Sequence, residues 1–345
     1  MKKILSIALA LLMVCVMLPV VALADEGITT EQALKDAITA ATDGATITLG
    51  GDIDLSQTIT VNKTITLNMN GKKLYNTSDL WDKPTAEAGN WSLISVRGSG
   101  NLTITGNGTF AAKENDCYAV DVQESATVTI KNGTFIGNIH AVYVFAGTAN
   151  VEGGTYSVQQ KYPDPAKGDE FVLNCYDANR ANGTAHINVT GGTFKNFNPA
   201  DNKAEGEGNN FADNSLVVQK NNTVQNNDYY VGNAANEVIA AASKGEEIFV
   251  LNGTTLTNVP AGVIIQNRTG DRITVNGKDV ELTGDAGYTV PASNITIIVP
   301  GDTTPTETPK TEDQKNPSTG ANDFVGLAAA AVVALLGSAV VLRKK

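Results

Sequence analysis

The stretch Val128-Thr-Ile-Lys-Asn-Gly-Thr-Phe135 carries the pattern that decides the fold of this chain. Two β-prone residues stand at alternate positions, a small turn follows, and Gly-Thr-aromatic closes the phrase. The same phrase recurs at residues 102–110, 149–156 and 187–194. Its aromatic residues stand at positions 110, 135, 156 and 194, so the intervals are 25, 21 and 38 residues. The first two intervals are typical of stacked solenoid repeats, and the third contains an insertion.

A shorter phrase precedes each copy, with apolar and polar residues in alternation: Ile94-Ser-Val96, Val120-Asp-Val122, Val142-Tyr-Val144 and Leu173-Asn-Cys175. Alternation with a period of two indicates strands. Two or three short strands per repeat, joined by Gly and Asn corners, describe one coil of a parallel β-helix. A single coil buries little, whereas stacked coils share one continuous core.

Stacking in register leads to specific predictions. Neighbouring parallel strands lie ~4.8 Å apart, so equivalent residues stand directly above one another. The chain should then form an inward aromatic ladder of Phe110, Phe135, Tyr156 and Phe194, and an aliphatic ladder of Ile104, Ile130, Val151 and Val189. The glycine before each threonine should turn the corner with a positive φ. An antiparallel sandwich is the alternative, but it gives no reason for one phrase to recur in phase.

These coils, together with Thr64-Ile-Thr-Leu-Asn-Met-Asn-Gly-Lys-Lys-Leu74, resemble the pectate-lyase-like β-helix segments of Gram-positive surface proteins. The resemblance covers about residues 27–232. It implies an all-β, right-handed parallel β-helix. Its motifs specify a fold far better than they specify a reaction.

Charge and cysteine content narrow the function classes. The chain has a formal net charge of −11 over 345 residues. The two ends expected to be processed carry +4, so the body between them is close to −15. A nucleic-acid or anionic-membrane partner is therefore disfavoured. Cys117 and Cys175 fall at different points of coils that are two repeats apart, too far for a disulfide, and we expect buried thiols.

The N-terminal region predicts export and a helix. Residues 1–24 have a basic start, an apolar run and a small-residue cleavage site between Ala24 and Asp25, which together describe a signal peptide. An uncleaved membrane anchor is the alternative. Thr29-Thr30-Glu31-Gln32 then indicates a capping box, with Leu34, Ile38 and Ala41 on one helical face. We expect this helix to cover the open end of the first coil, within a β-helix domain of residues 25–232.

From residue 233 the chain repeats the order of its own opening: helix, glycine, strand, then Asn276-Gly-Lys-Asp-Val280 in place of Asn70-Gly-Lys-Lys-Leu74. Residues 233–299 are therefore interpreted as a second, smaller helix-plus-strand module. The alternative is a closing cap of one continuous β-helix. Long polar segments at 75–90, 159–170 and 196–214 are expected to project as loops.

Residues 300–315 form a Thr/Pro-rich spacer, typical of an extended, solvated segment. Residues 316–345 follow, with Asn316-Pro317-Ser318-Thr319-Gly320, an apolar stretch at 324–342 that is long enough to span a bilayer, and a basic tail. This order resembles the cell-wall sorting signal of Gram-positive bacteria. The resemblance implies cleavage by a sortase between Thr319 and Gly320 and attachment to peptidoglycan outside the cell, with membrane contact only through the span before sorting. Asn316 stands where the commonest version has Leu, which leaves the sortase class open; a plain single-span anchor is the alternative.

Right-handed β-helices include polysaccharide lyases and hydrolases, so an enzyme is a candidate function. A lyase needs carboxylates that hold Ca²⁺ and a basic residue, and a hydrolase needs paired carboxylates. The sequence has no Asp-Asp pair and no Gly-His-Gly, and its two histidines, His140 and His186, fall at different points of their coils. We therefore assign no catalytic residue, metal site or cofactor; Ca²⁺ enters only under the lyase alternative.

A binding surface fits the pattern better. If Val120 and Val142 point inward, alternation sends one column of side chains outward and places a second column beside it. The predicted ligand-binding residues in these columns are Asp121, Tyr143, Phe145, Asn174 and Tyr176. Exposed rings beside hydrogen-bonding groups suit a glycan or a protein on a host or neighbouring cell. The alternatives are that the loop at 159–170 covers these residues, that the protein is a surface lyase or hydrolase of acidic glycans, or that it is a structural spacer without a ligand.

Overall fold

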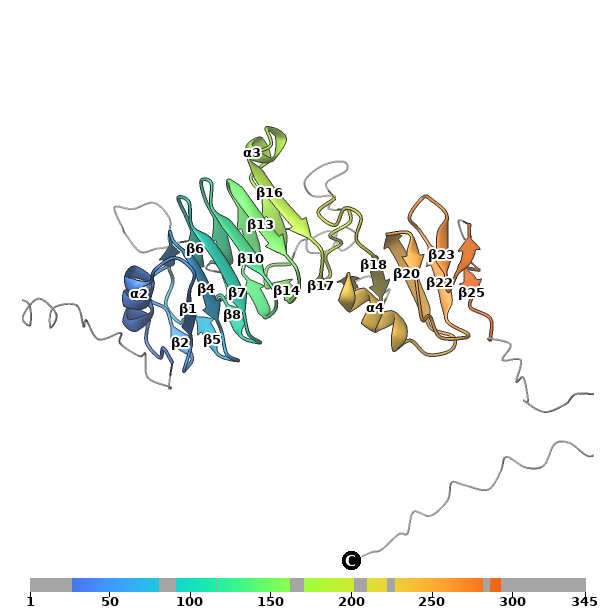
Figure 1. The fold of residues 1–345 in the computed structure, drawn as a ribbon, viewed down its shortest axis with the longest axis horizontal. Helices are drawn as coiled ribbons and strands as arrows, with labels where there is room; N and C mark the ends of the chain where they lie inside the picture. The colour runs from blue at the N-terminus through green and yellow to red at the C-terminus, as the bar shows by residue number, and fades with distance from the viewer. Residues whose placement is uncertain are drawn as a thin grey trace, which may run out of the picture. The chain divides into compact units, whose positions relative to one another are not determined.

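The structure is a computed structural model that describes residues 27–80, 91–115, 117–161, 171–201, 210–221, 227–281 and 286–292 (Figure 1). The predicted signal peptide, spacer and sorting signal lie outside these residues, as does most of the predicted loop at 159–170. Within the described ranges no helix is long and apolar enough to cross a membrane.

The first five coils of the solenoid each contribute one strand to each of three sheets, in which these strands pair in parallel; the sixth coil contributes to the first two sheets. Figure 1 shows strands of the first sheet side by side in chain order. The first sheet consists of β1 (Ala45–Thr48), β4 (Thr64–Asn68), β7 (Asn101–Thr105), β10 (Thr127–Ile130), β13 (Gly147–Val151) and β16 (Ala185–Val189). The second begins with β2 (Ile53–Asp54), β5 (Lys73–Tyr75), β8 (Thr109–Ala111), β11 (Thr134–Gly137), β14 (Thr155–Val158) and β17 (Gly192–Lys195). The third consists of β3 (Ile59–Val61), β6 (Ser92–Val96), β9 (Tyr118–Val122), β12 (Val142–Val144) and β15 (Leu173–Cys175).

The predicted ladders are confirmed. Phe135 pairs in parallel register with Phe110 on one side and Tyr156 on the other, and Tyr156 pairs with Phe194. The ring centroids of successive members are 4.9, 5.2 and 5.0 Å apart, with interplanar angles of 10–13°. The aliphatic ladder is in register as well, and every member of both ladders is buried. The chain is therefore an all-β, solenoid-like fold, and the sandwich alternative is wrong for these strands.

The glycines before the threonines were predicted to need a positive φ, and three of the four do. Gly133, Gly154 and Gly192 have φ values of 116°, 101° and 119°. Gly108 does not adopt a positive φ; it is needed because a Cβ there would lie 2.3 Å from the Cβ of Met69. Close approach of successive coils thus restricts this corner as strongly as backbone conformation does.

Helix α2 (Glu31–Ala40) precedes the first coil. Its N-cap is Thr30, whose hydroxyl accepts a hydrogen bond from the Ala33 amide at 3.2 Å, so the predicted cap is shifted by one residue. Leu34 and Ile38 are buried in the core that the coils share. Glu31 accepts bonds from the backbone amide and hydroxyl of Ser56, which attach the helix to the first coil.

The parallel solenoid ends after β17. The second sheet continues in antiparallel order through β19 (Asp228–Val231) and β18 (Val217–Lys220) to β20 (Glu247–Asn252), then through β22 (Ile264–Asn267) to β25 (Tyr288–Thr289). Phe197 and Phe211, from a segment read in the sequence as polar, are buried in the core of the coils. A polar loop thus supplies apolar residues where the parallel strands stop.

The part after residue 232 repeats the local structure at the start of the chain, where a helix is followed by a glycine with a positive φ and then by a strand. It begins with α4 (Asn233–Ala240), and Gly245 follows with a φ of +88°, as Gly44 follows α2 with +83°. The Gly44 amide donates to the carbonyl of Thr64, which begins β4, and the Gly245 amide donates to that of Gly262, two residues before β22, both at 2.8 Å. β20 pairs in parallel with β22 as β1 does with β4.

The similarity between the two parts of the chain ends at the Asn-Gly turn. Asn276-Gly277 closes an antiparallel hairpin of β23 (Ile273–Val275) and β24 (Lys278–Val280), which join β21 (Thr255–Leu256) in a small sheet, whereas Asn70-Gly71 leads from one coil sheet to another. The long sheet is continuous, but the buried residues form two clusters. The second-module interpretation stays a prediction.

Replacement of Gly153 by alanine should destabilise the fold strongly. A Cβ at this position would lie 2.3 Å from the carbonyl oxygen of Lys131 on the neighbouring coil, so two backbones would have to separate. We expect the free energy of unfolding, measured by urea denaturation, to fall by about 3 kcal/mol. Gly183→Ala is the matched control, because Gly183 has a φ of +76° but nothing within 4 Å of the added Cβ, and it should cost only about 1 kcal/mol. Equal costs would contradict the argument from coil contact.

Candidate ligand-binding site

The five predicted ligand-binding residues lie on adjacent positions of the third sheet. Tyr143 of β12 pairs with Asp121 of β9 and with Asn174 of β15, which gives one column across three coils. Phe145 and Tyr176 directly follow β12 and β15 and belong to the next column. The register thus brings all five together, and their role as ligand contacts stays a prediction.

Their exposure differs from the expectation in one case. Asp121 was expected to point outward to solvent, but its relative exposure is 0%. Tyr143 and Asn174 are partly buried, and Phe145 and Tyr176 are 39% and 43% exposed. The alternation of the strand does place Asp121 outside the coil, but neighbouring side chains then cover it. Asp121 is therefore corrected from an exposed ligand contact to a buried acid beneath this surface.

Asp121 is held by side chains from its own coil and the preceding one. Its two carboxylate oxygens accept hydrogen bonds from the Ser95 hydroxyl at 2.8 Å and the Gln123 amide at 2.7 Å. Arg97 lies close by and donates from Nε to the same Ser95 hydroxyl at 2.9 Å. Burial raises the pKa of Asp121 to about 6, although Ser95, Gln123 and Arg97 each oppose the shift. The network fixes this acid in place and keeps it away from solvent.

Tyr143 belongs to a packed cluster of rings. It stacks on His140 with centroids 5.0 Å apart and lies 5.4 Å from the ring of Tyr118. Burial lowers the pKa of His140 to about 4, and its Nδ1 is 2.8 Å from the carbonyl oxygen of Phe171. Burial also raises the pKa of Tyr118 to about 12 and moves that of Tyr143 upward. Tyr143 thus supports the surface from beneath at least as much as it forms part of it.

The two histidines behave as expected from their separate positions. His140 is packed among these rings, whereas His186 is exposed and lies 2.8 Å from the carbonyl oxygen of Gly183. In the part of the chain that the structure describes, no group of three or more His, Cys, Asp or Glu side chains could hold a metal ion. Cys117 and Cys175 are buried and are not joined to each other by a disulfide, which confirms that prediction.

Phe145 and Tyr176 form a stacked, exposed pair that we call the aromatic ledge. Their ring centroids are 4.9 Å apart with an interplanar angle of 25°. The amide of each residue donates to a carbonyl of the preceding coil at 2.9 Å, and the Asn179 side chain donates to the Phe145 carbonyl at 2.6 Å. Tyr176 stands directly before α3 (Asp177–Ala181). The ledge therefore has a fixed backbone beneath it while both rings face solvent.

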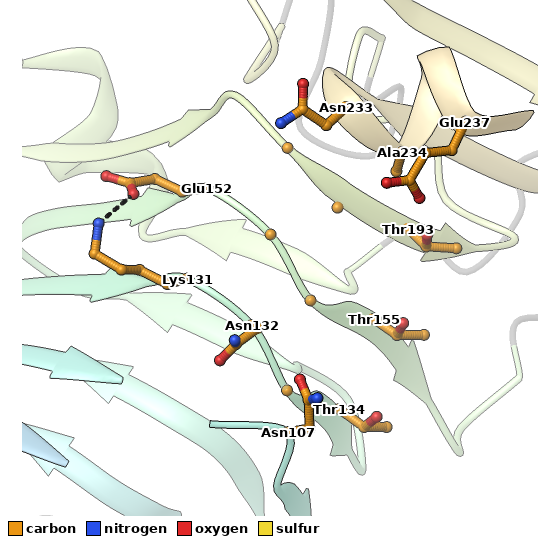
Figure 2. Close-up of a pocket in the computed structure, with 15 residues that line it drawn as sticks. Asn107, Lys131, Asn132, Thr134, Glu152, Thr155, Thr193, Asn233, Ala234 and Glu237 are labelled. Carbon is orange, nitrogen blue, oxygen red and sulfur yellow. Dashed lines mark hydrogen bonds and ion pairs between the residues drawn. The ribbon is translucent and has the colours of Figure 1, made fainter. Parts of the chain in front are cut away.

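A pocket of about 810 Å³ lies at the corner between the first and second sheets, and sequence reasoning missed it. Figure 2 shows Thr134, Thr155 and Thr193 in a row on three successive strands, with α4 beyond the last of them. The glycines of the repeated corner form its floor. The Gly-Thr-aromatic phrase could have indicated this row, because the threonine follows the corner and alternates with the buried ring. The contribution of α4 could not be read from the repeat.

The lining of the pocket is mostly polar, and Ala234 is its one apolar side chain. Lys131 and Glu152 form an ion pair of 2.8 Å along one side, and Asn233 and Glu237 of α4 line another side (Figure 2). Gly232 allows α4 to start here, because a Cβ at this residue would lie 2.2 Å from the carbonyl oxygen of Thr190. We call this site the corner pocket.

Asp121→Asn should make the protein more stable at neutral pH, and the gain should disappear in acid. The folded pKa of Asp121 is about 6 against an ordinary value of 3.8, so its ionised form is disfavoured in the fold. The stability that the protonated carboxyl contributes is complete below pH 3.8 and is lost as the pH rises through 6. Relative to the variant, the wild type should lose about 3 kcal/mol between pH 4 and pH 7. Thermal unfolding of both proteins across this range measures the difference, and a constant difference would contradict the assignment.

Comparisons with known proteins identify the C-terminal segment. Residues 317–345 match the family model described as the LPXTG cell wall anchor motif. The match includes Pro317, Ser318, Thr319 and Gly320, and Asn316 lies directly before it. No curated protein and no solved structure matches the chain. The match implies processing by a sortase and attachment to peptidoglycan. The protein is therefore an extracellular, cell-wall-anchored surface protein of a Gram-positive bacterium.

Proposed function

We propose that the protein is a display and adhesion module that binds a glycan on a host or neighbouring cell through the aromatic ledge. The observation that carries the proposal is the stacked pair of Phe145 and Tyr176, both of which are more than a third exposed. Among the residues that the structure describes, these two are the large hydrophobic side chains exposed to solvent. Exposed apolar rings on a surface that is otherwise polar mark a contact site.

The chemistry of the ledge suits a sugar ring. Aromatic faces pack against the apolar face of a sugar ring, and the Tyr176 hydroxyl offers a hydrogen bond at its rim. Stacking between Phe145 and Tyr176 and the backbone bonds beneath them restrict both rings before a ligand arrives. Pre-organised rings lose little conformational entropy on binding, which favours affinity from a small contact area.

The proposal includes a right-handed winding of the coils and a capping role for α2. Connections between parallel strands of one sheet are right-handed in ~98% of cases, which supports this winding. The burial of Leu34 and Ile38 in the core of the coils supports α2 as the cover of the first coil. A stiff, capped rod would hold the ledge away from the wall.

A surface polysaccharide lyase or hydrolase is the second candidate. The observation that favours it is the raised pKa of Asp121 beside Arg97, since buried carboxylates with shifted pKa values are frequent in active sites. Against it, both oxygens of Asp121 already accept hydrogen bonds and the side chain has no exposed surface. We expect no release of unsaturated products or reducing ends from acidic glycans with Ca²⁺. Turnover that Asp121→Asn abolishes would replace the adhesion proposal.

The double variant Phe145→Ala, Tyr176→Ala should lower binding of the protein to glycan-bearing cells or to an immobilised glycan array by about tenfold or more. Its free energy of unfolding should change by only about 0.5 kcal/mol per exposed ring. Phe135→Ala provides the folding control, because loss of this buried ring should cost about 4 kcal/mol.

Saturable binding that the double variant leaves intact would overturn the assignment of the ledge. Absence of any saturable ligand, on glycan arrays and on cells, would support the structural-spacer alternative instead. Binding that protease treatment of the target cells removes would identify the ligand as a protein and would contradict the choice of a glycan.

A further inference from the structure

We propose that the corner pocket is a second binding site, separate from the aromatic ledge, and that it takes an uncharged chain of N-acetylated hexosamines. The pocket lies where the chain turns from the first to the second sheet, whereas the ledge follows the third sheet. The two sites share no residue, so the proposal does not depend on the ledge.

The lining excludes an apolar ligand. Threonine hydroxyls, asparagine amides, one ion pair, Glu237, Ala234 and glycine backbone surround the space of about 810 Å³, and no lining residue is aromatic or a large aliphatic. An apolar group would gain no partner there, and burial of these polar groups beneath it would cost free energy. A ligand rich in hydroxyl and amide groups meets partners on every side.

The threonine row favours a polymer with a regular repeat. Thr134 pairs in register with Thr155, which pairs with Thr193, so the three hydroxyls recur at the strand spacing of ~4.8 Å. This spacing is close to the length of one pyranose unit in an extended chain. A row of hydroxyls at this interval offers one hydrogen-bonding group to each successive sugar unit that lies across the coils, and successive units of a β-1,4-linked chain present alternate edges to it.

The asparagines favour an acetamido substituent. Asn107, Asn132 and Asn233 line the pocket, and a carboxamide can both donate to and accept from an acetamido group. The Oδ1 atom of Asn132 is buried and has no hydrogen-bond partner among the residues that the structure describes. An unpaired buried acceptor is unfavourable, so a hydrogen bond from an N–H of the ligand would stabilise this side chain.

Charge disfavours an acidic chain. Lys131 and Glu152 neutralise one another through their ion pair, and Glu237 forms no ion pair within the described ranges, so the lining carries about one negative charge. The chain as a whole carries a formal net charge of −11. A uronic acid or sulfated sugar would be repelled, whereas an N-acetylated, uncharged unit would not.

Binding of chitotetraose and cellotetraose to the purified full-length chain tests the proposal by calorimetry. The two sugars have the same backbone and differ in the acetamido group. We expect saturable binding of chitotetraose and at least about tenfold weaker binding of cellotetraose. Thr155→Val removes one hydroxyl at nearly constant shape and should weaken chitotetraose binding by about tenfold. Thr129→Val, on the outer face of the first sheet and outside the pocket, is the matched control and should leave binding unchanged.

The outcomes separate this site from the ledge. Chitotetraose binding that persists in Phe145→Ala, Tyr176→Ala and weakens in Thr155→Val supports the corner pocket. The reverse pattern, equal binding of both sugars, or no binding of chitotetraose would overturn the proposal. A further experiment measures chitotetraose binding in competition with purified wall glycan strands or with mucin-type glycans. Inhibition of this binding by either glycan supports the assignment, and the stronger competitor identifies the source of the ligand.

Discussion

The structure depends on the close approach of successive backbones at the Gly-Gly-Thr-aromatic corner. A Cβ on Gly153 or Gly191 would lie 2.3 or 2.1 Å from a carbonyl oxygen of the coil below. Glycine at these positions lets the coils stack at strand spacing, and this spacing places Phe135 and Tyr156 in contact within the core. The buried Tyr156 hydroxyl donates to the carbonyl of Gly153 at 2.6 Å, so the same corner also satisfies the one polar atom in the ladder.

One register determines both the interior and the surface. Because neighbouring residues of a strand point to opposite sides, the alignment that stacks the rings inward also aligns Thr134, Thr155 and Thr193 outward. The same relation on the third sheet aligns Tyr143 with Asp121 above inward-facing valines. A repeat kept for its core therefore produces regular arrays of outward side chains. These arrays become binding sites only where other elements enclose or interrupt them.

The sequence predicted those features that follow from the repeat alone. The ladders and the columns were correct because register converts spacing along the chain into proximity. The burial of Asp121 was missed because it depends on Ser95 and Arg97 of the preceding coil, whose side-chain contacts a column assignment does not contain. The corner pocket was missed because α4, which lies well along the chain from Thr134, encloses it. The change to antiparallel pairing at β19 likewise has no signal in the repeat.

The proposed sites concentrate in the later coils, and the sequence gives a physical reason. Phe145 and Tyr176 end the fourth and fifth coils, and the threonine row runs from the fourth coil to the sixth. The earlier coils also contain one long interval, between β5 and β6, and neither proposed site uses it. The interval between Tyr156 and Phe194 contains the insertion, and α3 within it follows the ledge. Solenoids tolerate insertions at corners because the strands keep their register, so new surface can be added without altering the core. Binding chemistry is therefore expected where the repeat is interrupted and stability where it is regular.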